Sequence, residues 1–328
     1  MIDYRENKQI IDSLKSTIKD SLEPLIDSDC ILTDLPYHGN IGDILIWQGE
    51  LDFLKDIHRS PNHQSSHYTF SFPKLDKNII ILLHGGGNFG DLYSASQDFR
   101  KKILKAYPEN RIIMLPQSVW YNDSSLIEKD VVEFSRHSKL TLCARDIPSY
   151  NFLKKHFSSN NILLLPDMAF CLSEDLYNKY LNAKSNKKVL IKRLDKELSN
   201  DGLQDFSNLP VTEIRDWPTF EKNSAISTLL IYTAAILRKI KPCAFKRLIC
   251  RQIDKLITFR LRPHLINSGL RFLSEYSVIY TTRLHCLILG FLINRRVYYI
   301  NNVTKKLSAF TDSWLKAAKS ISPVNTAK

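Results

Sequence analysis

An arginine and a histidine stand two residues apart, at the point where an apolar, strand-like run gives way to an apolar, helix-like one. Arg283 and His285 follow the run at residues 278–281 and open the run at residues 284–293. The backbone N–H groups at a helix start favour an anion. A guanidinium binds carboxylate or phosphate through paired hydrogen bonds, and an imidazole titrates near neutral pH. These two residues therefore predict anion binding and proton transfer. The alternative is a helix-start arginine beside a hydrogen-bonded structural histidine.

A second polar segment occupies the same position relative to a strand-like run. Gly42 and Asp43 follow the apolar residues 30–35 and open a helical pattern. Glycine would let the backbone approach an anion closely at the start of that helix. The alternative is a tight turn in which Asp43 caps the helix or lies in its first turn, and this carboxylate could equally hold a sugar hydroxyl. We predict Gly42 and Asp43 as substrate-binding residues.

A third segment, from His84 to Asp91, follows the apolar residues 78–83 and is dense in glycine. A loop of this kind presents several backbone N–H groups to one point, as a phosphate or carboxylate requires. We predict that it binds substrate through Gly86, Gly87 and Asn88. It lacks the Lys-Ser/Thr pair of a P-loop, which disfavours ATP hydrolysis. A histidine that closes a buried strand is more often structural, so we expect His84 to be a hydrogen-bonded structural residue.

Strand-like runs alternate with helical patterns along most of the chain, and these elements must position the polar segments. The alternation covers residues 30–165 and resumes over residues 189–300, after a polar segment at 173–188 that is typical of a domain connection. It predicts the α/β class, with mostly parallel sheets and helices on both faces. A chain of 328 residues exceeds the usual size of a single core. We predict a Rossmann-like domain over residues 1–180, which begins with a helix, and a second domain over residues 181–328.

The composition excludes several classes of protein. A hydrophobic content of 44% with 24% charged residues is ordinary for a globular chain. The six cysteines include no CxxC pair, and several lie in apolar runs, which favours a reducing compartment over a disulfide framework or a zinc site. Residues 1–20 are amphipathic rather than signal-like, and the longest mainly apolar stretch, at 225–237, is too short to cross a bilayer. We therefore expect a cytoplasmic protein.

Positive charge is concentrated in one part of the chain. Ten lysines and arginines lie between Arg238 and Arg271, where Asp254 is the only acid. Apolar residues interleave with them at helical spacing. This pattern predicts a basic helical segment over residues 225–275 that rests on an anionic membrane surface, with the protein peripheral at the inner face of the cell membrane. A core-packed helix with a solvated basic face explains the pattern equally well. No nucleic-acid motif accompanies the charge, so we do not expect nucleic acid as a partner.

Six segments, in this order, resemble the polysaccharide pyruvyl transferases, which attach pyruvate from phosphoenolpyruvate to a sugar as a ketal. They lie between about Leu35 and Trp314 and read GNIGDILIWQGE, ILLHGGGNFGD, RIIMLPQSV, CARDIPSYNFLKKHF, LLPDMAF and TTRLHCLILG. The ordered set is specific, whereas any one segment alone would be weak. The resemblance implies two Rossmann-like domains that face a cleft, the glycosyltransferase-B-like architecture. It also implies that Arg283 binds the phosphoenolpyruvate anion and that His285 acts as general acid or base.

Three further residues receive roles from the resemblance. Gln117 would line the cleft, and Arg145 would face the substrate. The alternative for Arg145 is an ion pair with Asp146 or Asp167, and we interpret Asp167 itself as structural or as a helix cap. Lys306 matches a family lysine that would contact the phosphate, unless it is an ordinary solvated lysine. We expect no metal and no cofactor, because arginines and loop amides would neutralise the leaving phosphate.

The chain departs from the family pattern at a few positions. Thr282 stands where relatives commonly carry an acid beside the arginine, which removes an orienting partner for His285 or for an acceptor hydroxyl. Relatives commonly carry an acidic residue and then a Tyr-Gly-Lys segment where this chain has Asn301 and Thr304. The leading hypothesis is a pyruvyl transferase that modifies a lipid-linked saccharide during exopolysaccharide, capsule or lipopolysaccharide synthesis. The alternatives are a nucleotide-sugar-dependent glycosyltransferase of the same fold and a relative that has lost catalysis and serves as a saccharide-binding scaffold.

Overall fold

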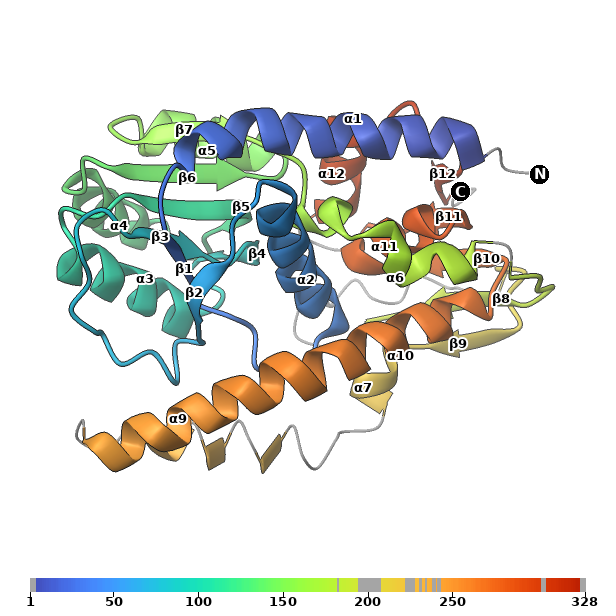
Figure 1. Cartoon of the computed structure of the whole chain (residues 1–328). Helices are drawn as coiled ribbons and strands as arrows, with labels where there is room; N and C mark the ends of the chain where they lie inside the picture. Colours follow the sequence, from blue (N-terminus) through green and yellow to red (C-terminus); the bar gives the residue numbers. More distant parts are fainter. Residues whose placement is uncertain are drawn as a thin grey trace.

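The computed structural model describes residues 4–181, 183–193, 208–221, 228–229, 232–233, 235–237, 240, 243–301 and 305–324. Its described elements are parallel strands separated by helices, which confirms the predicted α/β class. The strands form two separate sheets, drawn to the left and to the right in Figure 1. The predicted domain boundary between residues 180 and 181 falls after the last strand of the first sheet and before the first strand of the second.

The first sheet has seven strands in the order β2-β1-β3-β5-β6-β7, with β4 paired to β5. All of these pairs are parallel. Parallel strands need crossover helices, which cover both faces of the sheet, and the inner strands therefore read as continuous apolar runs. The strands are β1 (Cys30–Thr33), β2 (Pro61–Gln64), β3 (Ile80–Leu83), β4 (Gly86–Gly90), β5 (Ile112–Trp120), β6 (Leu140–Ala144) and β7 (Asn161–Leu164). The crossover helices are α2 (Ile41–Asp56), α3 (Ser94–Ala106), α4 (Ser125–Ser135) and α5 (Ile147–His156).

The second sheet has five parallel strands in the order β12-β11-β10-β8-β9. They are β8 (Lys188–Ile191), β9 (Glu213–Arg215), β10 (Val278–Thr281), β11 (Arg296–Tyr299) and β12 (Ile321–Pro323). Helix α11 (Leu284–Leu292) is buried along its whole length and connects β10 to β11. Helix α12 (Lys306–Trp314) follows β11, and the short helices α6 (Glu174–Tyr177) and α7 (Pro218–Glu221) lie in the connections. This second strand–helix alternation confirms the one expected from the sequence.

Helix α1 (Tyr4–Leu22) confirms the predicted N-terminal helix and lies across the top of the molecule in Figure 1. Its buried residues Ile11, Leu14, Ile18 and Leu22 recur every three or four positions, so they form one apolar face. Helix α1 contacts α11 and the 3-10 helix η2 (Met168–Cys171), which follows the first sheet. It thereby packs against elements associated with both sheets.

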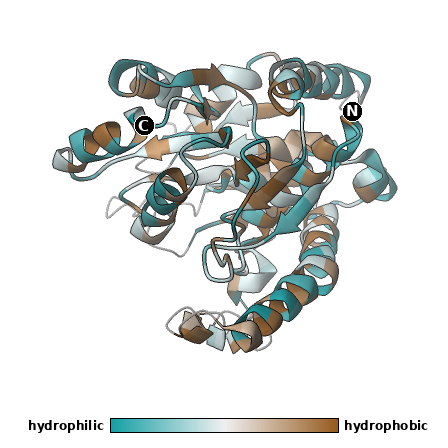
Figure 2. Ribbon diagram, turned by 60° about the vertical axis from the view of Figure 1, so that its left-hand side comes forward, coloured by the Kyte–Doolittle hydropathy of each residue, from teal (hydrophilic) through white to brown (hydrophobic). Residues whose placement is uncertain are grey.

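A long helix runs along the opposite edge of the molecule, drawn in orange in Figure 1. It consists of α9 (Ala244–Leu256), a π-helical turn η4 (Ile257–Leu261) and α10 (Arg262–Ser274). Helix α10 packs on α2 and α11. Figure 2 shows that apolar and polar residues alternate along the whole long helix. The helical prediction for residues 225–275 is confirmed over residues 244–274. Arg238, Lys239 and Lys241 lie outside the described residues.

One predicted loop is a strand. The segment from His84 to Asp91 was expected to form an open glycine-rich loop, but its centre forms β4 and pairs with β5. Two of its glycines make this path feasible, because Gly86 has φ 129° and Gly90 has φ 107°, in the region that side chains disfavour. A Cβ on Gly90 would also lie 1.9 Å from the carbonyl oxygen of Trp120 on the neighbouring strand. The glycines thus serve close strand packing as well as any ligand.

Candidate active site

A cleft of about 650 Å³ opens at the carboxyl ends of strands from both sheets. Its first-sheet wall comes from residues after β1, β3 and β6, and its second-sheet wall from residues after β8, β9 and β10. Ligands of parallel sheets bind at this end of the strands, because helix N-termini and loops converge there. Of the residues predicted from sequence, the cleft is lined by Asp43, Gly87, Asn88, Arg145, Arg283, His285 and Lys306.

His285 lies in the first turn of α11, near a carboxylate that was expected to be structural. Its Nε2 lies 3.4 Å from Oδ2 of Asp167, which is fully buried. The contact is longer than an ordinary N–H···O bond, as apo catalytic contacts often are. The same Asp167 oxygen accepts a 2.8 Å hydrogen bond from Nη1 of Arg145. Burial alone would raise the pKa of Asp167, but the charges of His285 and Arg145 hold that pKa well below its ordinary value.

Asp167 is ordered by its backbone position as well. It follows Pro166 at the carboxyl end of β7, and its Oδ1 accepts a 2.9 Å hydrogen bond from the Ala169 amide at the start of η2. The predicted cap role is therefore confirmed, and the second carboxylate oxygen has a separate use. Thr282 removes one possible orienting partner for His285, and Asp167 is a carboxylate that lies near the imidazole instead.

Gly42 packs directly against the catalytic candidate. A Cβ at this position would lie 2.5 Å from Nδ1 of His285 and 2.8 Å from its Cγ. Asn40, rather than Asp43, caps α2, and its Oδ1 accepts from the Gly42 amide at 3.1 Å. That amide is therefore occupied, and the requirement for glycine comes from the imidazole rather than from an approaching anion.

Asp43 lies in the first turn of α2 and lines the cleft. Its Oδ2 accepts a 2.8 Å hydrogen bond from Nδ2 of Asn40. Burial opposes ionisation, but the charges of His38, His285, His84 and Arg145 lower the pKa of Asp43 below its ordinary value. The first-turn alternative for Asp43 is confirmed, and its carboxylate is ionised at neutral pH.

Arg283 is tied to an acid that the sequence analysis did not single out. Its Nε and Nη2 donate to the two carboxylate oxygens of Asp216, the latter at 2.7 Å, and its guanidinium lies 4.6 Å from the ring centroid of Phe220. Asp216 follows β9 and is buried. Arg283 lines the cleft. The two guanidinium N–H groups that pair with Asp216 form the fork that was expected to bind phosphoenolpyruvate.

Thr282, one of the departures from the family pattern, has a backbone role. Its Oγ1 accepts a 3.0 Å hydrogen bond from the amide of Arg193 and donates to the carbonyl of Ile191 at 3.4 Å. These contacts join the carboxyl ends of β8 and β10, so that Arg193 lines the cleft. The second departure is Asn301. Its Oδ1 accepts a 3.0 Å hydrogen bond from the amide of Ser308, which lies in the first turn of α12. Thr304 lies outside the described residues.

A cationic corner forms where β4 meets α12. A Cβ on Gly87 would lie 3.0 Å from Nη2 of Arg145 and 3.4 Å from Nζ of Lys306. Both cations are buried, with Lys306 only 8% exposed, so the alternative of a solvated lysine is wrong. Arg145 Nε donates to Ser118 Oγ at 2.8 Å, and Ser118 Oγ donates to Asp146 at 2.6 Å. Of the two ion pairs considered for Arg145, the one with Asp167 is present.

Three other predicted residues have structural partners. His84 is buried against Glu50, with Nδ1 2.8 Å from Oε2, and this pairing raises the pKa of His84 against the effect of burial. The structural interpretation of His84 is confirmed. Gln117 donates to the His84 carbonyl at 2.6 Å and is not part of the cleft lining. Asn88 lines the cleft, but its Oδ1 accepts from Arg100. Gly86 lies beside Asp43, whose Oδ1 would be 3.9 Å from a Cβ there.

Sequence analysis missed Asp167, Asp216 and Arg193 as members of the site. Asp216 directly follows β9, and Arg193 and Asp167 lie two and three residues beyond the ends of β8 and β7. Their positions near strand ends are the signal in the sequence that could have found them. Over the described ranges between residues 4 and 324, no group of three His, Cys, Asp or Glu side chains could hold a metal ion, and no helix is long and apolar enough to cross a membrane.

Comparisons with known proteins identify the family of the chain. The family model for polysaccharide pyruvyl transferase matches residues 40–302. EpsO of Bacillus subtilis, a protein assigned to the pyruvyl transferases, is 31% identical over 93% of this chain and 92% of its own. Pyruvyl transferase 1 of Schizosaccharomyces pombe is 25% identical over 87% of this chain and 69% of its own. A crystal structure of a functionally uncharacterised Klebsiella pneumoniae protein has the same fold, with a TM-score of 0.61 and 19% identity over 94% of this chain and 99% of that one.

Proposed function

Because the chain belongs to the polysaccharide pyruvyl transferase family, we propose that its cleft moves pyruvate from phosphoenolpyruvate onto a sugar of a cell-surface polysaccharide precursor, as a ketal. The observation that carries this proposal is the chain of contacts from Arg145 to Asp167 to His285 within the cleft. It places a histidine beside an ionised carboxylate, and a buried cation beside a glycine-lined wall. The same cleft would be formed by the two Rossmann-like domains of a glycosyltransferase-B-like arrangement.

The donor binds at the cationic corner. Arg145 and Lys306 both lie close to Gly87, so an anionic group at this wall would meet two cations. A dianionic phosphate or the carboxylate of phosphoenolpyruvate gains most where cations are already desolvated. Arg283 contributes positive potential to the opposite wall, although its fork is held by Asp216. Phosphoenolpyruvate is the donor substrate, and the proposal includes no further cofactor.

Proton transfer assigns the roles of the remaining groups. Protonated His285 delivers a proton to the methylene carbon of phosphoenolpyruvate, which makes the adjacent carbon electrophilic. A sugar hydroxyl attacks that carbon and loses its proton, with ionised Asp43 available to accept it. Phosphate then leaves against Arg145 and Lys306 and takes the proton held by Asp43. The second hydroxyl attacks the same carbon to close the ketal and gives its proton to His285, which is thereby restored. The products are the cyclic ketal and inorganic phosphate, so each hydroxyl proton and the added carbon proton are accounted for.

The acceptor is a lipid-linked saccharide presented at the inner membrane face, and α9 supports that location. Its exposed apolar side chains Phe245, Leu248 and Leu256, together with Phe259 of η4, recur at helical spacing. The residues that α9 buries, such as Cys250 and Ile253, lie on its other face. Exposed cations flank the apolar stripe: Arg247, Arg251, Lys255 and Arg260. An apolar stripe flanked by cations is the pattern of a helix that lies in an anionic lipid interface.

Phosphate release tests the proposal. We expect purified protein to release phosphate from phosphoenolpyruvate only when lipid-linked saccharides from its own host are supplied, and His285→Ala to remove that release. Thermal unfolding with phosphoenolpyruvate reports donor binding separately. Donor binding without release in every acceptor preparation would favour a catalytically lost relative. Stabilisation by nucleotide sugars and none by phosphoenolpyruvate would instead favour a glycosyltransferase and reject the proposal.

A further inference from the structure

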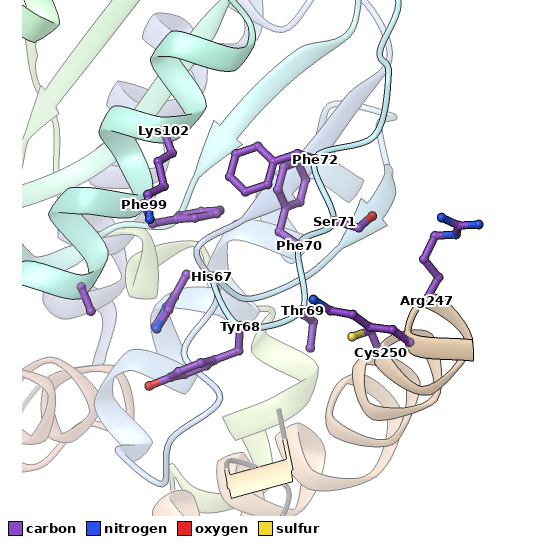
Figure 3. Close-up of a pocket in the computed structure, with 12 residues that line it drawn as sticks. His67, Tyr68, Thr69, Phe70, Ser71, Phe72, Phe99, Lys102, Arg247 and Cys250 are labelled. Carbon is purple, nitrogen blue, oxygen red and sulfur yellow. The ribbon is translucent and has the colours of Figure 1, made fainter. Parts of the chain in front are cut away.

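A second pocket, of about 310 Å³, lies between α9 and the first sheet's helix α3. Figure 3 shows its aromatic side chains Phe70, Phe72 and Phe99 grouped together. The rings of Phe70 and Phe72 pack edge to face with centroids 5.0 Å apart, and those of Phe72 and Phe99 lie 5.9 Å apart. This volume is at the lower end of the range of about 300–1,000 Å³ that is typical of ligand pockets.

The pocket combines an aromatic floor with a purely cationic rim. Lys102 comes from α3, and Lys246 and Arg247 come from the first turn of α9. The residues that line the pocket include no carboxylate, whereas the main cleft is lined by Asp34 and Asp43. Three cations among described lining residues that include no carboxylate favour a multiply charged anion. Lys246 also donates to the carbonyl of Ile240 at 2.7 Å, which fixes its ammonium near the helix start.

Phe72 is held in a costly conformation at this pocket. Its φ is 51°, in the left-handed region that bulky side chains rarely adopt, and its side chain is 40% exposed. Strain of this kind persists where the surrounding structure imposes it, and it concentrates at ligand sites. An exposed, strained aromatic residue contributes little to the core, so its position indicates a use at the surface.

The pocket adjoins the main cleft. His67, Tyr68 and Ala95 line both cavities. Helix α9 is also joined to the cleft wall, because the Tyr37 hydroxyl donates to Oδ1 of Asp254 at 2.7 Å and Tyr37 lines the cleft. A ligand that occupied the pocket could therefore extend past His67 and Tyr68 toward His285.

We propose that this pocket binds the diphosphate and the first isoprenoid units of the lipid carrier to which the acceptor saccharide is attached. The diphosphate contacts Lys102, Lys246 and Arg247, and the apolar units pack on Phe70, Phe72 and Phe99. The rest of the lipid remains in the bilayer beside the exposed stripe of α9, and the saccharide extends into the cleft. This assignment rests on the proposed function for the acceptor, but it concerns a separate set of residues.

Titration with farnesyl diphosphate, without vesicles and below the concentration at which it aggregates, tests the pocket directly. We expect the double variant K246Q/R247Q to bind it at least about ten-fold more weakly than wild type, because two charge-assisted contacts are lost. The control K255Q/R260Q removes the same charge from the same long helix but outside the pocket, and its affinity should stay within about three-fold of wild type. Equal losses in both variants would show diffuse electrostatic attraction and reject the pocket.

Three further arms identify what is bound. Phe72→Asn removes the ring but suits a left-handed backbone, so we expect it to reduce affinity for farnesyl diphosphate toward that for inorganic pyrophosphate. Farnesol should bind much more weakly than the diphosphate. Saturating phosphoenolpyruvate should not displace farnesyl diphosphate, and displacement would place the probe in the main cleft and overturn the assignment.

The titration does not depend on turnover. If farnesyl diphosphate bound as expected but no acceptor supported phosphate release, the pocket would stand and the proposed chemistry would fail. If pyruvyl transfer occurred but wild type did not bind farnesyl diphosphate, the pocket assignment would be wrong and the proposed function would stand.

Discussion

Replacing Gly42 with alanine should displace His285 without disturbing the fold. The added Cβ would lie 2.5 Å from Nδ1 and 2.8 Å from Cγ of the imidazole, closer than real Cβ contacts come. Relief requires a movement of about 1 Å, and a misplacement of this size at a reacting group costs about 100-fold in rate. Gly42 lies in the first turn of α2, where alanine is the better helix former by about 1 kcal/mol. An off-rotamer His285 would cost a similar amount and offset this gain in helix propensity. The free energy of unfolding of Gly42→Ala should therefore differ from that of wild type by less than about 1 kcal/mol.

The assay is steady-state phosphate release from phosphoenolpyruvate with a saturating acceptor, compared with thermal unfolding of the same preparations. Gly39→Ala is the matched control. Gly39 also lines the cleft, but the nearest heavy atom to a Cβ there is Cβ of Thr219, at an ordinary 3.6 Å. We expect Gly42→Ala to lose about 100-fold in kcat and Gly39→Ala to stay within about three-fold of wild type. A Gly42→Ala enzyme with wild-type kcat would refute the placement of His285 as the reacting group.

Three other variants test separate parts of the account. Asp167→Asn should lower kcat at least about ten-fold, because His285 and Arg145 lose the carboxylate that both contact; an unchanged kcat would argue against this role. Burial raises the pKa of Asp254 to about 6, so the folded state holds this proton more tightly than the unfolded chain, and the free energy of unfolding should fall as pH rises from about 4 to 6. Urea titrations should show that the free energy of unfolding of Asp254→Asn, relative to that of wild type, rises by up to about 3 kcal/mol between pH 4 and pH 7. A difference that stayed constant with pH would contradict the raised pKa of Asp254. Replacing Phe245 and Phe259 with serine should weaken sedimentation with anionic vesicles and leave phosphoenolpyruvate binding unchanged, whereas equal sedimentation would remove the apolar stripe from membrane binding.

The alternation of strands and helices could be predicted because buried parallel strands must be apolar on both faces. Strand β3, Ile80–Leu83, is an uninterrupted apolar run of this kind and is fully buried. Strand β2, Pro61–Gln64, gave no signal because it pairs on one side only, at the sheet edge, and is polar. The glycines of β4 indicated a loop, since strand pairing through positive φ values cannot be read from residue types.

The site residues could be found from sequence where a residue type and a strand end coincided, as for Arg145 and His285. Their partners could not, because partnership is a tertiary property. Asp167 is distant from His285 in the chain, and Asp216 reaches Arg283 from a strand at the far edge of the second sheet. The guanidinium of Arg283 was consequently assigned to substrate, although a protein carboxylate pairs with it. The role of Gly42 is likewise a contact with an imidazole and is visible only in the fold.

The most direct test of the central claim is the fate of the three carbon atoms of phosphoenolpyruvate. Isotopically labelled phosphoenolpyruvate should be incubated with wild type or His285→Ala and host lipid-linked saccharide, and the saccharide then analysed by NMR. The account predicts a labelled quaternary ketal carbon joined to two oxygens of one sugar, with one phosphate released for each ketal, and neither product with the variant. Label recovered only as free pyruvate, or a ketal formed equally well by His285→Ala, would contradict it.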